Sequence, residues 1–75
     1  MEITVKLWDE LEEEMVFWTF RVNANGYIDI VIEGKIMDTL LEIGEVRNMG
    51  ELLSKVNELL EGWKIRWESK RLLLK

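Results

Sequence analysis

Two apolar strands joined by a tight turn constrain the fold of this chain more than any other part of its sequence. Alternate positions of both strands are apolar: Val16, Trp18, Phe20 and Val22 before the turn, and Ile28, Ile30 and Ile32 after it. Alternation with a period of two is typical of strands that are buried on one face only. The sequence therefore predicts a β-hairpin within residues 15–35 whose apolar face belongs to the core.

The turn Asn23-Ala24-Asn25-Gly26-Tyr27 decides which residues face each other across this hairpin. A two-residue turn at Asn25-Gly26 would place Trp18 opposite Glu33, so that apolar side chains would cover charged ones. A three-residue loop with Gly26 in the left-handed conformation, a G1 bulge, pairs Trp18 with Ile32 instead. We expect this second register, because a shift by one residue exchanges the two faces of a whole strand. The same register also pairs Val22 with Ile28, Phe20 with Ile30 and Arg21 with Asp29.

The segment before the hairpin has the pattern of a further strand followed by an acidic connection. Apolar and polar residues alternate over residues 2–7, which predicts a half-buried strand. Residues 9–14 hold five acids in six positions, and we interpret them as a solvated loop because they lack the spacing and glycine of a calcium-binding loop. After Ile32 the alternation continues through Gly34 and Ile36, so we expect the second strand to extend past residue 34.

A capped amphipathic helix is the clearest element of the second half. Asn48 stands at an N-cap position and Glu51 follows three residues later, which is the spacing of a capping box. Six apolar residues recur at spacings of three and four and form one stripe: Met49, Leu52, Leu53, Val56, Leu59 and Leu60. With Gly62 as the expected stop, the pattern predicts a helix over residues 49–61 that covers the apolar face of the hairpin. Residues 38–48 fit a short strand near 39–43, which we favour, or a short helix or loop.

The last part of the chain combines tryptophan, basic residues and leucine. Aromatic and apolar residues alternate with charged ones over residues 63–68, which predicts a final strand. A helix with Trp63 and Trp67 on one face is the alternative. The alternation fails at Ser69, so either a bulge shifts the phase or Leu72-Leu73-Leu74 face a separate apolar surface, as they would against a partner chain.

Together these elements predict a single α+β domain that spans residues 1–75. We expect a mainly antiparallel sheet of four or five strands with one long helix packed on one face, in the order β-β-β-α-β. A chain of 75 residues is near the size at which one hydrophobic core only just outweighs conformational entropy. Association into a homodimer would bury further surface, and the surplus Leu72-Leu73-Leu74 leads us to expect it.

The residue inventory argues against catalysis. The chain has no His and no Cys, which leaves no Ser-His-Asp or Cys-His arrangement and no thiolate metal site. The sequence contains no glycine-rich phosphate loop, and a pair of catalytic carboxylates would need a cleft that so small a domain hardly forms. We therefore expect no enzymatic activity, no cofactor and no metal. Enrichment in Glu and Lys with few thermolabile residues is typical of heat-adapted proteins.

The net charge of −5 is unevenly distributed along the chain. Residues 1–62 hold five bases against fourteen acids, whereas residues 63–75 hold five bases against Glu68 alone. No apolar run is long enough to cross a bilayer, and the N-terminus begins with an acid where a signal peptide would be basic. From this pattern we expect a cytoplasmic protein that does not enter a membrane.

Protein–protein interaction is the function that the sequence predicts. The face of the hairpin opposite the helix carries Phe17, Tyr27 and Val31, and one helix covers only one face of a sheet. These residues, with Leu72 and Leu74, are therefore the candidate interface with a second copy or another protein. The alternative is single-stranded nucleic-acid binding by the C-terminal strand, with four cations beside the tryptophans as contacts: Lys64, Arg66, Lys70 and Arg71. An edge strand kept soluble by these cations is the simpler interpretation.

Overall fold

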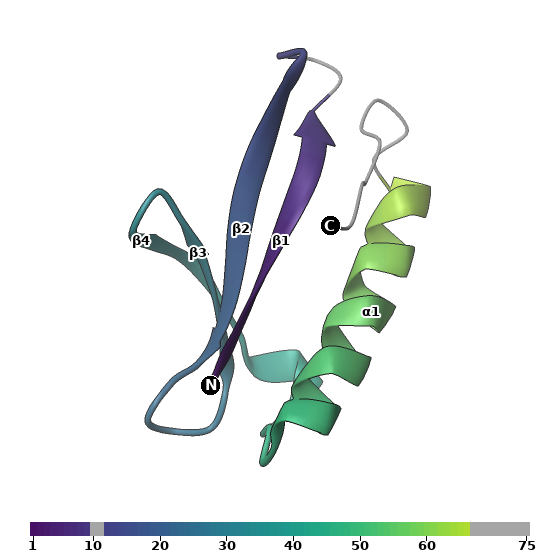
Figure 1. The fold of residues 1–75 in the computed structure, drawn as a ribbon. Coiled ribbons are helices and arrows are strands. Elements are labelled where there is room, and N and C mark those ends of the chain that lie inside the picture. Colours follow the sequence, from purple (N-terminus) through teal and green to yellow (C-terminus); the bar gives the residue numbers. More distant parts are fainter. Residues whose placement is uncertain (10–11, 67–75) are drawn as a thin grey trace.

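The computed structural model describes residues 1–9 and 12–66 and shows a four-stranded antiparallel sheet with one helix packed on it (Figure 1). The strands β1 (Glu2–Asp9), β2 (Glu14–Val22), β3 (Ile28–Ile32) and β4 (Lys35–Leu40) lie side by side in chain order. A short 3₁₀ helix, η1 (Leu41–Ile43), precedes α1 (Met49–Arg66), and α1 runs alongside β1. The predicted α+β class is confirmed.

The turn between β2 and β3 has the register that the sequence predicts. Trp18 pairs with Ile32, Phe20 with Ile30 and Val22 with Ile28. Gly26 has a φ of 88°, and the N–H of Asn23 donates to the carbonyl oxygen of Tyr27 at 2.9 Å. The Asn23 Oδ1 atom accepts the N–H groups of Asn25 and Tyr27 at 2.9 and 3.2 Å, so this side chain holds the loop in shape.

A second, tighter turn separates β3 from β4, and it overturns the expectation that one strand continues through Gly34. Glu33 and Gly34 have φ values of 52° and 77°, as the two central residues of a type I′ hairpin turn do. The chain therefore reverses, and Ile36 pairs with Val31. The short strand predicted near residues 39–43 is shifted as well, because β4 ends at Leu40 and the 3₁₀ helix follows.

The helix begins where its cap predicts and ends later than its glycine predicts. Asn48 Oδ1 accepts the N–H of Glu51 at 2.9 Å, while Glu51 Oε2 accepts the N–H of Arg47 at 3.0 Å. The helix then continues through Gly62, so the predicted stop is wrong, and residues 63–66 are helical rather than a strand. Each residue added to a nucleated helix gains one hydrogen bond, which offsets the cost of about 1 kcal/mol for glycine. The rest of the predicted final strand lies outside the described residues.

The core fills the space between α1 and the sheet face that it covers. Its buried apolar residues come from all four strands, from the loop before the helix and from the helix: Val5, Leu7, Phe20, Ile28, Ile30, Leu40, Val46, Leu52, Val56 and Leu60. The buried stripe of the helix is narrower than predicted, because Met49 and Leu53 are about half exposed. Within the described residues, no helix is long and apolar enough to cross a membrane.

The loop between η1 and α1 is hydrogen-bonded both to a turn of the sheet and to the helix. Val46 is buried, and its N–H donates to the carbonyl oxygen of Gly26 at 2.7 Å, which joins the loop to the β2–β3 turn. Lys55 of α1 donates from Nζ to the carbonyl oxygens of Ile43 and Glu45 at 3.0 and 3.3 Å. These bonds fix the path by which the chain passes from the edge strand β4 to the helix on the opposite side.

Candidate functional site

The face of the sheet that points away from α1, here called the outer face, carries the candidate interface. Strand pairing places Thr4, Thr19, Val31 and Ile36 in one row across all four strands. Phe17 lies in the adjacent row, diagonal to Val31. Phe17 and Ile36 are 59% and 62% exposed, whereas Val31 between them is 6% exposed because its neighbours cover it. The fold thus brings together two residues predicted from the sequence, Phe17 and Val31, and adds Ile36 to them.

A lysine on the neighbouring strand positions the Phe17 ring. Lys6 pairs with Phe17 across β1 and β2, and its Nζ atom lies 5.7 Å from the ring centroid. A cation–π contact of this kind contributes about 0.5–1 kcal/mol at an exposed site. The ring remains 59% exposed despite this contact, so it has apolar surface free for another molecule.

The other end of the outer face is a polar network. Arg21 pairs in register with Asp29, as the sequence predicts, but its ion pair joins Nε to Glu2 Oε1 at 3.1 Å. Asp29 is buried, and its Oδ1 atom accepts hydrogen bonds from Asn23 Nδ2 at 3.1 Å and from Thr39 Oγ1 at 2.6 Å. These bonds tie the β2–β3 turn, β3 and β4 together, and the exposed apolar side chains Phe17 and Ile36 lie toward the opposite end of the face.

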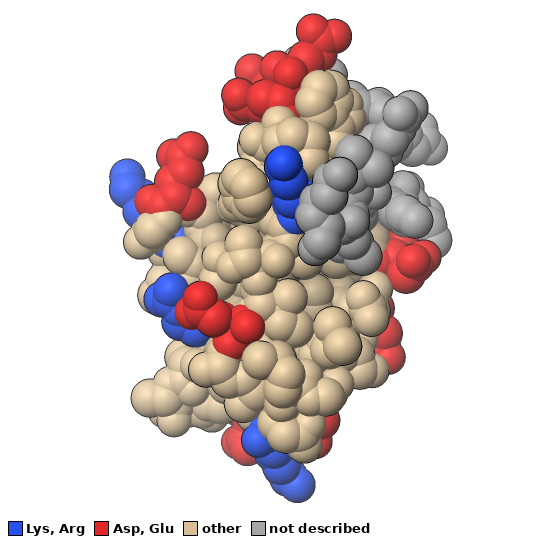
Figure 2. Space-filling model, in the orientation of Figure 1, with Lys and Arg blue, Asp and Glu red and all other residues tan. Residues whose placement is uncertain are grey.

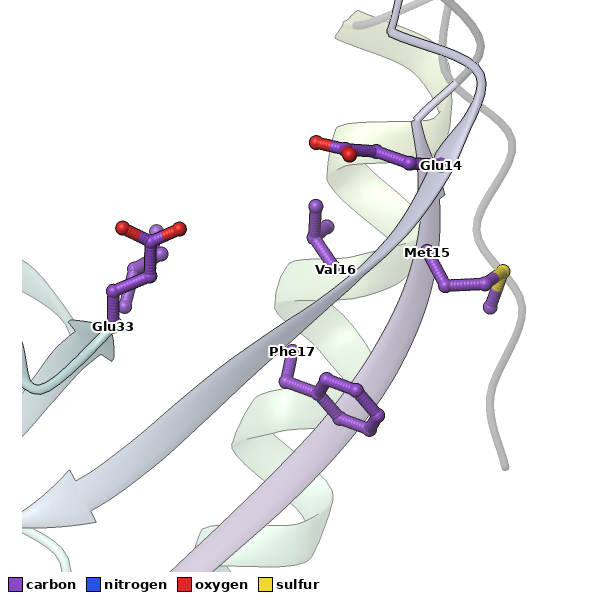
Figure 3. A pocket seen from close by; sticks show the side chains of 6 residues that line it. Glu14, Met15, Val16, Phe17 and Glu33 are labelled. Carbon is purple, nitrogen blue, oxygen red and sulfur yellow. The ribbon is translucent and has the colours of Figure 1, made fainter.

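An open pocket of about 380 Å³ lies at that opposite end, where β2 extends beyond the β3–β4 turn (Figure 3). Four of its lining residues are consecutive in β2 and two follow one another at the end of β3: Glu14, Met15, Val16, Phe17, Ile32 and Glu33. Figure 3 shows Glu14 extending from β2 toward the side of the pocket where Glu33 lies, and Glu33 on that opposite side. The pocket therefore has apolar walls and a carboxylate on each side.

Other residues predicted for the interface are placed elsewhere. Tyr27 is half-buried at the end of the β2–β3 turn, beside the polar network rather than beside Phe17. Leu72 and Leu74 lie outside the described residues. Lys64 and Arg66, the first two candidate nucleic-acid contacts, belong to the last turns of α1 and not to a strand. The other two, Lys70 and Arg71, also lie outside the described residues.

Three exposed apolar residues near the edge of the sheet were not predicted as interface residues. Ile36, Met37 and Leu41 are each 62% exposed. Recognising the turn at Glu33-Gly34 would have placed Ile36 opposite Val31 on the outer face, since a two-residue turn fixes the register of the strand that follows.

Acidic side chains gather at the end of the sheet where β1 connects to β2, and uncharged side chains fill much of the middle of this view (Figure 2). The described acids at this end are Asp9, Glu12, Glu13 and Glu14. Within residues 1–9 and 12–66, no cluster of three or more acidic side chains has the geometry to hold a metal ion. The acidic end thus contributes a negative field beside the pocket.

Comparison of this chain with protein-family models, with curated proteins and with solved structures finds no match in any of the three.

Proposed function

We propose that this protein is a non-catalytic binding module that acts through protein–protein contacts and associates with a second copy of itself through the outer face. The observation that supports this proposal is the exposure of Phe17 and Ile36 on either side of Val31. Burial of a large apolar side chain contributes about 1.5–3 kcal/mol, so two such residues per chain give a substantial driving force in a symmetric contact.

The arrangement of side chains on the outer face also suits self-association. A symmetric dimer uses the same patch on both copies, and two sheets pack face to face through apolar side chains at a spacing of about 10 Å. Charged groups of the outer face include Lys6 of β1, which lies over the Phe17 ring, and the Glu2–Arg21 ion pair. They provide the polar rim that surrounds the apolar centre of a typical interface.

The test is the mass of the protein in solution over a range of concentrations, measured by sedimentation velocity. We expect a dimer for the unmodified chain and a monomer for Ile36→Lys and for Phe17→Lys, because each substitution places a charge in the centre of the interface. Leu53→Lys is the matched control, since Leu53 is 51% exposed on α1, away from the outer face, and this variant is expected to remain a dimer. A concentration-independent monomer for the unmodified chain would refute the homodimer.

Single-stranded nucleic acid is the alternative partner, and the basic residues of the segment 63–75 are what supports it. Binding to a labelled oligonucleotide at low salt, lost on Lys64→Glu/Arg66→Glu and falling steeply with added salt, would favour this function over the dimer. The absence of oligonucleotide binding at low salt would remove it.

A further inference from the structure

The first residues of β2 have a neighbouring strand on one side only. β2 pairs with β1 along the whole of Glu14–Arg21, but it pairs with β3 only from Trp18 onward, because β3 ends at Ile32. Among the described residues, no strand pairs with Glu14–Phe17 on the β3 side. This short open edge is the part of β2 that lines the pocket.

The hydrogen-bonding groups of this edge are identified by the strand geometry. The N–H of Val22 donates to the carbonyl oxygen of Met1 at 3.0 Å, so even-numbered residues of β2 direct their backbone groups toward β1. The N–H of Asn23 donates the other way, to Tyr27, and the direction alternates along an antiparallel strand. Met15 therefore directs its N–H and C=O into the open side, and exposed edge groups of this kind are a template for another strand.

The surroundings of the edge determine which strand fits. Val16 and Ile32 line the pocket with apolar surface, and Glu14 and Glu33 place a carboxylate on each side of it. The described acids Asp9, Glu12 and Glu13 add further negative charge at the same end. A second copy that approached with this same edge would meet like charges, whereas a basic segment would be attracted.

We infer that the open edge of β2 at Glu14–Phe17 binds an extended, basic and apolar segment of another polypeptide by β-strand addition. The backbone of the segment pairs with Met15, its apolar side chains contact Val16 and Ile32, and its Lys or Arg side chains pair with Glu14 and Glu33. This site adjoins the proposed dimer interface and shares Phe17 with it, but it binds through the backbone edge of β2 and the pocket rather than through the outer face.

The backbone part of the inference is tested with a fluorescein-labelled peptide of four alternating Lys-Val pairs, by fluorescence anisotropy. Met15→Pro removes the N–H that points into the open side and leaves the pairing with β1 intact, since proline is tolerated on an edge. We expect peptide affinity to fall about tenfold or more for Met15→Pro, because one hydrogen bond is lost and the ring obstructs the incoming strand. Met15→Val, which keeps the N–H, is the matched control and is expected to bind nearly as the unmodified chain does.

The charge part is tested with Glu14→Lys/Glu33→Lys against Glu42→Lys/Glu58→Lys, which changes the net charge equally at exposed positions outside the pocket. We expect the first pair to weaken peptide binding about tenfold and the second pair to have a much smaller effect. A peptide of alternating Glu and Val is expected not to bind. In ¹⁵N–¹H spectra, addition of the Lys-Val peptide is expected to shift the amides of Met15, Phe17 and Glu33.

Several results would overturn the inference. No saturable binding, equal binding of the Lys-Val and Glu-Val peptides, or equal affinity of the Met15→Pro and Met15→Val variants would each do so. If Met15→Pro instead abolishes self-association while Met15→Val does not, the edge belongs to a second copy. If Lys70→Glu/Arg71→Glu alone shifts the Met15 amide, the edge is occupied by the chain's own C-terminal segment. Retention of the unmodified amide shifts of Phe20 and Leu52 verifies that each variant is folded.

Discussion

Removal of the buried carboxylate of Asp29 is expected to destabilise the protein strongly, although Asp29 lies on the outer face of the sheet and not in the apolar core. Asp29 is 5% exposed and accepts hydrogen bonds from two side chains, Asn23 Nδ2 at 3.1 Å and Thr39 Oγ1 at 2.6 Å. Asn23 also shapes the β2–β3 turn, and Thr39 belongs to β4. The substitution Asp29→Ala therefore leaves two partly buried donors without their acceptor and loosens the contacts of β3 with β4 and with the β2–β3 turn.

The size of the effect follows from these two bonds. A hydrogen bond to a charged group contributes about 1.5–3 kcal/mol when it is shielded, and water replaces part of this where a partner is only half-buried. We expect Asp29→Ala to cost about 3 kcal/mol, compared with a total stability of about 4–11 kcal/mol for a chain of this length. The corresponding decrease in Tm is about 15–20 °C.

Urea denaturation followed by circular dichroism measures the change. Asp38→Ala is the matched control, because Asp38 is an exposed carboxylate that accepts a hydrogen bond from the Thr39 N–H at 2.8 Å, and this bond is also exposed to solvent. We expect this substitution to cost about 0.5 kcal/mol. The double variant Asp29→Ala/Thr39→Val is expected to cost about 1 kcal/mol less than the sum of the costs of its two single substitutions. Equal costs for Asp29→Ala and Asp38→Ala, or strict additivity, would refute the reasoning.

Two further predictions concern local backbone structure. Gly34→Ala is expected to destabilise the protein by about 1–2 kcal/mol because Gly34 has a φ of 77°. Gly62→Ala, in the helix, is expected to stabilise it by about 1 kcal/mol. Neither new Cβ has a neighbour within 4 Å, and denaturant midpoints that move in the same direction for both variants would contradict this. Asn48→Ala is expected to cost about 1 kcal/mol through loss of the cap on Glu51, while Asn48→Asp is expected to keep it; equal thermal midpoints for the two variants would contradict the cap.

The central hairpin was predictable because one residue pair excluded the wrong register. Placing Trp18 over Glu33 is costly enough that only a loop with Gly26 in the left-handed conformation remains, and the structure has that loop. The start of α1 was predictable for a similar reason, since Asn48 and Glu51 provide side-chain groups for backbone donors that would otherwise have no partner.

The strand β4 was not predictable from the same pattern. Apolar alternation through Ile32, Gly34 and Ile36 favoured a straight strand, which would keep Ile32 and Ile36 on one face, whereas the two-residue turn pairs Ile32 with Lys35 and places Ile36 on the opposite face. Glu33 lacks the usual turn chemistry of Asn or Asp before glycine, so no local signal favoured reversal. This failure explains why Ile36 was not included in the candidate interface although Val31 was.

The end of the helix illustrates a different limit. Alternation over Trp63–Arg66 is too short to distinguish a strand from a helical turn, and the preceding helix determines the outcome, since extension of a formed helix is easier than nucleation of a new element. The candidate contacts Lys64 and Arg66 were therefore assigned to a strand by a signal that the adjoining helix overrides.

The arrangement of α1 beside β1 has a consequence for how the molecule comes apart. Every strand neighbours the one before it in the chain, so the sheet forms through contacts of low sequence separation, and the packing of α1 beside β1 joins the first strand to the last described element. β1 is thus an edge strand of the sheet and also a strand on which α1 packs. A pulling force applied at residue 1 would peel β1 from β2 and uncover the part of the apolar stripe of α1 that packs on β1, whereas the same force applied to β4 would leave α1 packed against β1.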